Sequence, residues 1–251
     1  MTTPYVGSSL VSLSRVHETQ HALVLIPAAG SGVAPFKTWK TVLDGVASIY
    51  AVRLPGRESR LSEAAPTTIE AAAREVARAL EQLEERSVVL LGHCSGALTA
   101  FEVAQLDQQS RETRLTALVV ASQRAPSGPI FERGLDLMDN PTFLRYLQIA
   151  ADIPTVVWEN EELMKLLIPQ IKSDFEAVDR YSPNTKRRKL AIPIIGLAGS
   201  DDSDCPIELM ESWRSETTGT FRTETFVGGH SFIFDQADAA ANTIRLAFMS
   251  S

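Results

Sequence analysis

Six short apolar runs recur along the chain, and each is ended by glycine, proline or a polar residue. They lie at residues 22–27, 49–56, 87–92, 115–122, 192–199 and 221–229, with stretches of helical periodicity between them. Successive parallel strands need a long crossover, usually a helix, so this alternation indicates a mostly parallel sheet flanked by helices. The pattern therefore predicts an α/β fold.

The clearest helix follows Pro66. Apolar residues then repeat at steps of three and four along one face, and Thr67 and Glu70 have the spacing of a capping box at its start. The repeating residues are Ile69, Ala73, Val76, Leu80 and Leu83. This stripe is interpreted as core.

The alternation stops between residues 127 and 185, where no strand signal is found. An insertion of that length in an α/β domain is usually a lid. Its apolar residues fall at helical spacings and predict two or three amphipathic helices: Leu144, Tyr146, Leu147, Ile149, Leu163, Leu166, Leu167, Ile168, Ile171 and Phe175. Most should pack the lid onto the domain, and a minority could line an acyl channel. With no linker evident, residues 1–251 are expected to form one domain.

Charge and composition narrow the function classes. The 251 residues are 44% hydrophobic and carry a net charge of -7, which argues against nucleic acid as the main partner because phosphate binding needs a basic face. The basic run at 186–189 is interpreted as a solvated turn. Two cysteines provide neither a disulfide framework nor a metal site. Without a signal-peptide or membrane-span pattern, we expect a cytoplasmic protein with no membrane partner.

Candidate chemistry begins at the end of the third run. Gly92 and Gly96 flank Cys94 at the spacing of a nucleophile elbow, where the neighbouring positions must be nearly free of side chain. Ser95 as the nucleophile would need a small residue at 93, which is His93. The following helix start and a nearby imidazole would favour the thiolate of Cys94. The alternative is a packed structural cysteine, and His93 itself is expected to be a packing residue whose ring points away.

Hydrolases with such an elbow place an acid after a late strand and a histidine after the last one. Asp201, Asp202 and Asp204 follow the fifth run, and His230 follows the sixth. The order fits a Cys-His-Asp triad, although a solvated acidic turn would produce the same cluster. The other histidines, at 17, 21 and 93, do not occupy such a loop.

The oxyanion hole of this arrangement needs two backbone N–H groups, one from the residue after the nucleophile and one from the loop after the first run. That loop, residues 27–32, consists mostly of small residues. Gly30 and Gly32 also resemble the start of a dinucleotide-binding motif. The third glycine of that motif would fall at Pro35, so we exclude it.

Through these motifs the chain resembles the type II thioesterases of nonribosomal peptide and polyketide synthesis, members of the α/β-hydrolase superfamily. Besides the elbow, the landmarks are Pro-Ala-Ala-Gly at 27–30, Leu-Pro-Gly-Arg at 54–57, Phe-Glu-Val-Ala at 101–104, Ser-Gln-Arg-Ala-Pro at 122–126, Leu-Ile-Pro-Gln-Ile-Lys-Ser-Asp-Phe at 167–175 and Gly-Gly-His-Ser-Phe at 228–232. The resemblance implies an α/β-hydrolase fold with a helical lid.

The resemblance also assigns roles. The family places its acid three residues after a glycine, which selects Asp202 after Gly199, and its oxyanion donors correspond to the amides of Ala29 and Ser95. It implies hydrolysis of acyl or aminoacyl thioesters on the phosphopantetheine arms of carrier proteins, with no cofactor or metal of its own. Arg57 and Arg60 are then the basic residues expected to steer an acidic carrier protein. The resemblance implies no role for Asp201 or Asp204 and no oligomeric state.

Two positions depart from the family pattern. Ala28 replaces a histidine, which leaves the backbone donor intact. Cys94 replaces the nucleophilic serine, so the acyl-enzyme would be a thioester nearly equal in energy to the substrate and reactive toward amines and thiols. Acyl transfer, cyclisation or aminolytic release is therefore an alternative reaction to hydrolysis. A hydrolase outside polyketide and nonribosomal peptide synthesis is a second alternative. A non-catalytic carrier-protein docking subunit is a third. Cys205 is expected to pack in the core.

Overall fold

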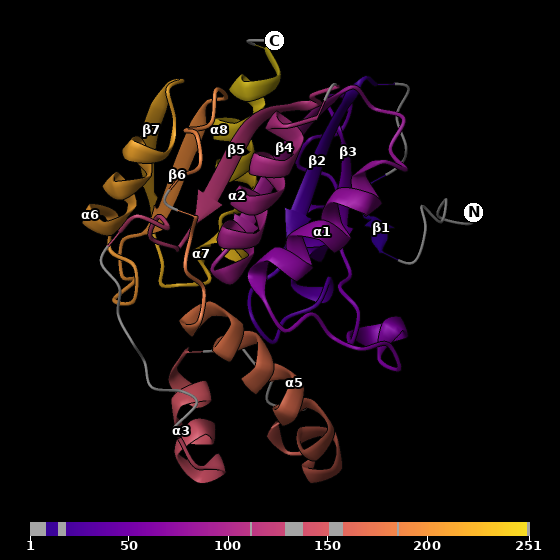
Figure 1. Ribbon diagram of the computed structural model, residues 1–251, viewed down its shortest axis with the longest axis vertical. Helices are drawn as coiled ribbons and strands as arrows, with labels where there is room; N and C mark the ends of the chain where they lie inside the picture. Colours follow the sequence, from indigo (N-terminus) through magenta and orange to yellow (C-terminus); the bar gives the residue numbers. More distant parts are fainter. Residues whose placement is uncertain are drawn as a thin grey trace.

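The chain forms one seven-stranded sheet in a computed structural model that describes residues 9–14, 19–110, 112–128, 138–150, 158–184 and 186–249. The strand order is β1-β3-β2-β4-β5-β6-β7, with β1 antiparallel to β3 and all other pairs parallel (Figure 1). The strands are β1 Leu10–Ser12, β2 His21–Ile26, β3 Ser48–Val52, β4 Ser87–His93, β5 Leu115–Ala121, β6 Ile194–Gly199 and β7 Phe221–Phe226. The α/β prediction and all six predicted strands are confirmed. The sequence pattern did not indicate β1.

Helices cover both faces of the sheet (Figure 1). On one face lie α1 Ile69–Leu80 and α2 Ser95–Gln108, with α6 Ile207–Met210 and the 3-10 helix Glu211–Glu216; on the other lie α7 Phe232–Asp235, α8 Ala237–Met249 and the 3-10 helix Ala34–Trp39. Every residue of β3 and β6 is buried. Strands buried on both faces have continuous apolar sequences, which is why they were predictable.

The start of α1 differs by one residue from the prediction. The side chain of Thr68, not that of Thr67, accepts a hydrogen bond from the amide of Ala71 at 3.1 Å. Ile69, Ala73 and Val76 are buried as the stripe predicted, so the predicted core face is confirmed.

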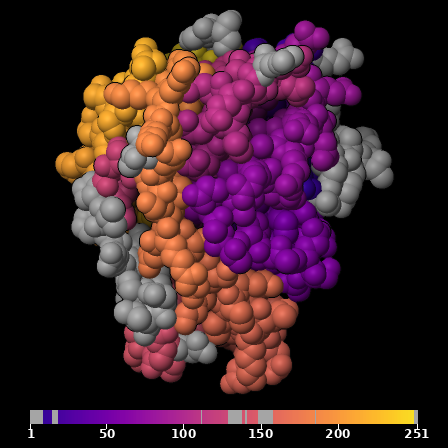
Figure 2. Space-filling view, viewed as in Figure 1, coloured from indigo at the N-terminus to yellow at the C-terminus, as the bar shows by residue number. Residues whose placement is uncertain are grey.

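Two helices of the predicted lid are described, α3 Asn140–Ala150 and α5 Glu161–Asp179. They lie beyond the carboxyl ends of the parallel strands (Figure 1), and Figure 2 shows α5 in orange-red against the lower end of the purple N-terminal half. Phe143, Leu147, Ile171 and Phe175 form a separate apolar cluster that reaches Ala29. Lid residues 129–137, 151–157 and 185 lie outside the described residues. Within the described chain, no helix is long and apolar enough to cross a membrane.

Candidate active site

Cys94 occupies the turn between β4 and α2, with a backbone φ of 53° and ψ of -126°. A positive φ is rare for a residue with a side chain and marks a strained position. A Cβ added at Gly92 would lie 2.2 Å from the carbonyl oxygen of Gly96, and one added at Gly96 would lie 2.3 Å from that of Ile26. Glycine is therefore required at both positions, and the local fold is the strand-turn-helix that the spacing predicted.

His230 and Asp202 lie beside this turn, at the carboxyl ends of β7 and β6. His230 Nδ1 is 3.0 Å from Asp202 Oδ2 and 3.2 Å from Oδ1, and the same imidazole is hydrogen-bonded to Cys94. The Asp202 side chain is 1% exposed, whereas Asp201 and Asp204 are exposed. Of the three candidate acids, the structure brings Asp202 to the histidine.

The electrostatics of the three side chains favour charge separation. Burial alone would raise the pKa of Asp202, but hydrogen bonds and the positive charge of His230 lower it to about 2. Burial alone would lower the pKa of His230, but Cys94 and Asp202 raise it to about 11. The imidazole is therefore able to take and hold the thiol proton beside the Asp202 carboxylate.

His93 makes a contact that sequence reasoning missed. Its Nε2 lies 2.9 Å from the backbone carbonyl oxygen of His230, and the Ser122 hydroxyl donates to the same oxygen at 3.0 Å. Burial, aided by the positive charge of His230, lowers the pKa of His93 to about 3, so the ring is neutral and donates through Nε2. The ring packs at 5.2 Å from Phe234, as a packing residue should. It also contacts the backbone of His230, a role beyond packing.

Ala29 and Ser95, the expected oxyanion donors, line one small pocket beside the elbow. Other amides of the 27–33 loop are used internally: Gly30 donates to Asp174, Ser31 to the carbonyl of Ala28, and Val33 to Glu58. Neither the amide of Ala29 nor that of Ser95 donates to an acceptor in the described part of the chain. Both N–H groups are thus available to a substrate oxygen.

The comparisons with known proteins show the family of the chain. Residues 21–247 match the thioesterase domain family. The chain belongs to this family. It is 30% identical to the thioesterase PikA5 of Streptomyces venezuelae, over 88% of this chain and 79% of PikA5, and 27% identical to the gramicidin S biosynthesis protein GrsT of Aneurinibacillus migulanus, over 85% and 83%.

Solved structures of thioesterases have the same fold. The type II thioesterase BorB from the borrelidin biosynthetic cluster superimposes with a TM-score of 0.86 at 27% identity, covering 99% of this chain and 100% of BorB. YbtT, a type II thioesterase from the yersiniabactin pathway, gives 0.87 at 25% identity, over 97% and 99%. The chain is therefore a thioesterase with a mostly parallel seven-stranded α/β-hydrolase sheet.

The basic residues expected to steer a partner are not free in this thioesterase. Arg57 is 7% exposed and pairs with Asp174, and Arg60 is 6% exposed and pairs with Glu63 and Glu75. Both guanidinium groups are neutralised inside the protein, so the steering prediction is wrong for these two residues. In the 186–189 run, Arg187 is not solvated as expected, because it pairs with Glu216 at 3.0 Å.

Cys205 lies in the core beneath the acid loop. It is 3% exposed, and its Sγ is 3.5 Å from Met210 Sδ. Burial raises the pKa of its thiol to about 12, and the two cysteines do not form a disulfide with each other. Within the described ranges, no three metal-ligating side chains gather at one point.

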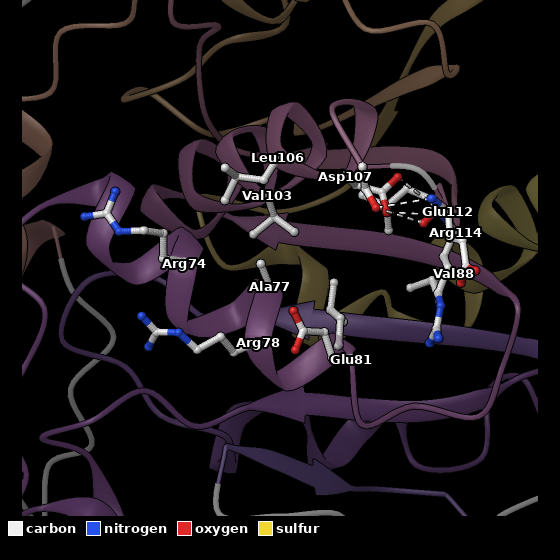
Figure 3. Close-up of a pocket in the computed structure, with 13 residues that line it drawn as sticks. Arg74, Ala77, Arg78, Glu81, Val88, Val103, Leu106, Asp107, Glu112 and Arg114 are labelled. Atoms are coloured by element: carbon white, nitrogen blue, oxygen red, sulfur yellow. Dashed lines mark hydrogen bonds between the residues drawn. The ribbon is translucent and has the colours of Figure 1, made fainter.

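A groove between α1 and α2 (Figure 3) lies near the start of β4, away from the elbow. Arg74, Ala77 and Val103 are among its lining residues, together with Val88 near the start of β4. Cys94 follows the opposite end of that strand, about 20 Å away at 3.3 Å per residue. The groove is therefore separate from the candidate site at Cys94.

Proposed function

We propose that this thioesterase hydrolyses acyl or aminoacyl thioesters on the phosphopantetheine arms of carrier-protein domains in polyketide or nonribosomal peptide synthesis. The observation that carries the proposal is that His230 is hydrogen-bonded to both Cys94 and Asp202, beside two available amides. The descriptions of GrsT, BorB and YbtT as proteins of biosynthetic systems support this setting. In this proposal the carrier protein is the partner, and no cofactor beyond the substrate's own arm takes part.

The first step transfers the acyl group to the enzyme. The Cys94 thiolate attacks the substrate carbonyl carbon, and the amides of Ala29 and Ser95 stabilise the negative charge on the carbonyl oxygen. The carbon–sulfur bond to pantetheine then breaks, and His230 donates its proton to the departing thiolate. The products are a free pantetheine thiol and a thioester on Cys94.

The second step releases the acyl group. His230, now neutral, removes a proton from water, and the resulting hydroxide attacks the acyl carbon of the Cys94 thioester. Collapse of the tetrahedral intermediate yields the carboxylic acid and regenerates the thiolate beside the protonated His230. Asp202 orients the imidazole through Nδ1 and stabilises its positive charge in both steps.

A cysteine nucleophile supports a second candidate function. A serine would convert the thioester to a more stable oxyester, whereas Cys94 keeps the acyl group in a thioester that amines and thiols attack readily. Acyl transfer, cyclisation or aminolytic release through the same acyl-enzyme is therefore the alternative reaction.

A non-catalytic docking role is the third candidate, and the reactivity of Cys94 distinguishes it. A thiolate held beside an imidazolium reacts with iodoacetamide near neutral pH far faster than free cysteine does. Alkylation at the rate of free cysteine would support the docking role.

The experiment that tests the proposed function follows both steps. Short and long acyl pantetheine thioesters are mixed with the thioesterase, pantetheine thiol release is measured, and intact mass reports the acyl-enzyme. Water, an amine or a thiol is then offered, and the products identify which one discharges it. Cys205→Ala is the matched control, because it removes the other thiol. Discharge by water at the rate of turnover supports hydrolysis. Discharge only by amine or thiol replaces it with transfer, and absence of an adduct and of thiol release contradicts both.

A further inference from the structure

The lid helix α5 is attached directly to the loop that carries Ala29. Oδ2 of Asp174, on α5, accepts a hydrogen bond from the amide of Gly30 at 2.7 Å and an ion-paired hydrogen bond from Nη2 of Arg57. The side chains of Asp174 and Arg57 are 18% and 8% exposed. One carboxylate oxygen thus joins the lid, the 27–33 loop and the segment after β3.

Arg57 contacts the lid helix α5 at two residues, Asp174 and Gln170. Its Nη1 donates to Oε1 of Gln170 at 3.0 Å, one turn before Asp174 on α5, and to the carbonyl of Gly56 at 3.1 Å. Two hydrogen-bond donors on one rigid guanidinium plane therefore contact successive turns of the lid helix.

The loop and α5 are also in direct van der Waals contact. Gly30 has a φ of +71°, and a Cβ added there would lie 3.0 Å from Ile171 Cγ2. The backbone of the loop consequently packs against the side chain of Ile171, so a shift of α5 would release or displace this part of the loop.

The geometry of one peptide links this contact to the chemistry. The amide of Gly30 belongs to the planar peptide that joins it to Ala29. Holding that amide fixes the plane and restricts the rotation of Ala29, whose own N–H is the oxyanion donor of the proposed function. Errors of about 1 Å in such a donor lower rates by about a hundredfold.

Stability alone does not account for the buried Asp174–Arg57 pair. Burial raises the pKa of the Asp174 carboxyl despite the opposing effects of Arg57 and the Gly30 amide. Desolvating a carboxylate and a guanidinium offsets much of their mutual attraction, so buried pairs often add little net stability. A role in placing the loop accounts for a charge pair at this position.

We propose that Asp174 and Arg57 are positioning residues that hold the Ala29 amide in its oxyanion-binding orientation, so that the oxyanion hole is complete only while lid helix α5 is docked. This rests on the proposed function, in which Ala29 binds the substrate oxygen. Lid docking would then control catalysis through the loop as well as through access to Cys94.

The test compares two reactions of the same sulfur. Acylation of Cys94 by an acyl pantetheine thioester passes through an oxyanion, whereas alkylation by iodoacetamide is a direct displacement at a methylene carbon and forms none. For Asp174→Ala we expect the first-order acylation rate at saturating substrate to fall about 10- to 100-fold, a range below the loss of a whole oxyanion donor. Alkylation should stay within about twofold of wild type.

Conservative variants refine the comparison. Asp174→Asn keeps an oxygen acceptor for the Gly30 amide and should retain more acylation than Asp174→Ala. Arg57→Lys keeps the positive charge but cannot contact both Asp174 and Gln170 as the guanidinium does. Glu176→Ala is the matched control, because Glu176 pairs with Arg180 at the end of the same helix at 3.4 Å; among the described residues its side chain has no hydrogen bond or ion pair to the loop. It should leave both rates within about twofold. If Asp174→Ala fails to fold by circular dichroism, the two conservative variants give the same comparison.

The outcomes separate this proposal from the proposed function. Unchanged acylation in folded Asp174 variants overturns the positioning role while the thioesterase proposal stands. An equal fall in acylation and alkylation also overturns it, because a general distortion of the elbow would affect both reactions. If wild-type Cys94 is not acylated at all, the proposed function fails and the positioning role fails with it.

Discussion

Replacing Asp202 by Asn should make the imidazolium of His230 easier to deprotonate while leaving Cys94 and His230 in place. Asp202 stabilises the positive charge on His230, and that imidazolium in turn stabilises the thiolate. Asn has nearly the same shape and retains an oxygen to accept from the amide of Cys205, which is 3.0 Å from Asp202 Oδ1. The substitution therefore removes charge from the site with little change in packing.

The magnitude follows from the pKa of Asp202. Its fall from the ordinary 3.8 to about 2 corresponds to about 2 kcal/mol at about 1.36 kcal/mol per pH unit. His230 is the largest stabilising cause, and the hydrogen bond from the amide of Cys205 adds to it. Because coupling between two groups is reciprocal, the carboxylate stabilises the imidazolium by about 1 to 2 kcal/mol. Its loss should therefore lower the pKa of His230, which is about 11 in the wild type, by about one pH unit.

The assay is the first-order rate of Cys94 acylation by an acyl pantetheine thioester between pH 7 and pH 12, followed by intact mass. The basic limb of the profile, at which His230 loses the proton that it gives to the departing thiolate, should shift to lower pH in Asp202→Asn by about one unit. Asp201→Asn and Asp204→Asn are matched controls, because each removes a carboxylate from the same loop, and their profiles should overlie wild type. An unshifted limb in folded Asp202→Asn, or equal shifts in the controls, would refute the reasoning.

Other expectations follow from the same geometry. Gly96→Ala should abolish thiol release and lower the free energy of unfolding by about 1 to 3 kcal/mol or more, because its Cβ would lie 2.3 Å from the carbonyl oxygen of Ile26. A wild-type free energy of unfolding in urea would contradict this. Cys94→Ser should keep partial turnover, and a complete loss would show that the site is tuned for sulfur alone. His230→Ala should slow acylation at least about 100-fold, with burst amplitude as the measurement. A depressed carboxyl pKa contributes stability above its unfolded value, so wild type should lose about 2 kcal/mol more than Asp202→Asn as pH falls from 4 to 2. Equal losses in acid titrations would argue against a buried carboxylate at 202.

The parts of the fold that local sequence determines could be predicted. Five strands, β2 to β6, were visible because strands buried on both faces require continuous apolar runs. β7 is mostly exposed or half-buried, and its polar and apolar residues are mixed. The elbow was visible because the turn at Cys94 leaves no room for a Cβ at Gly92 or Gly96. β1 was missed because three residues, Leu10–Ser12, form too short a pattern, and their place is set by pairing with β3.

The contacts that could not be predicted join residues far apart in the chain. Nε2 of His93 meets the carbonyl of His230, 137 residues away, and Asp174 meets the amide of Gly30, 144 residues away. A backbone carbonyl or amide has no sequence signal, so neither partner was visible. The prediction for Arg57 failed because its counter-ion, Asp174, is also distant in the chain, 117 residues away on the lid helix.

The most direct test of the account is to locate the acyl group after a brief exposure to an acyl pantetheine thioester. The protein is quenched in acid, digested and sequenced by tandem mass spectrometry. The account predicts one acyl group, on the sulfur of Cys94, and none on protein carrying Cys94→Ala. An undiminished adduct in Cys94→Ala, or an acyl group on any other residue of the wild type, would contradict it.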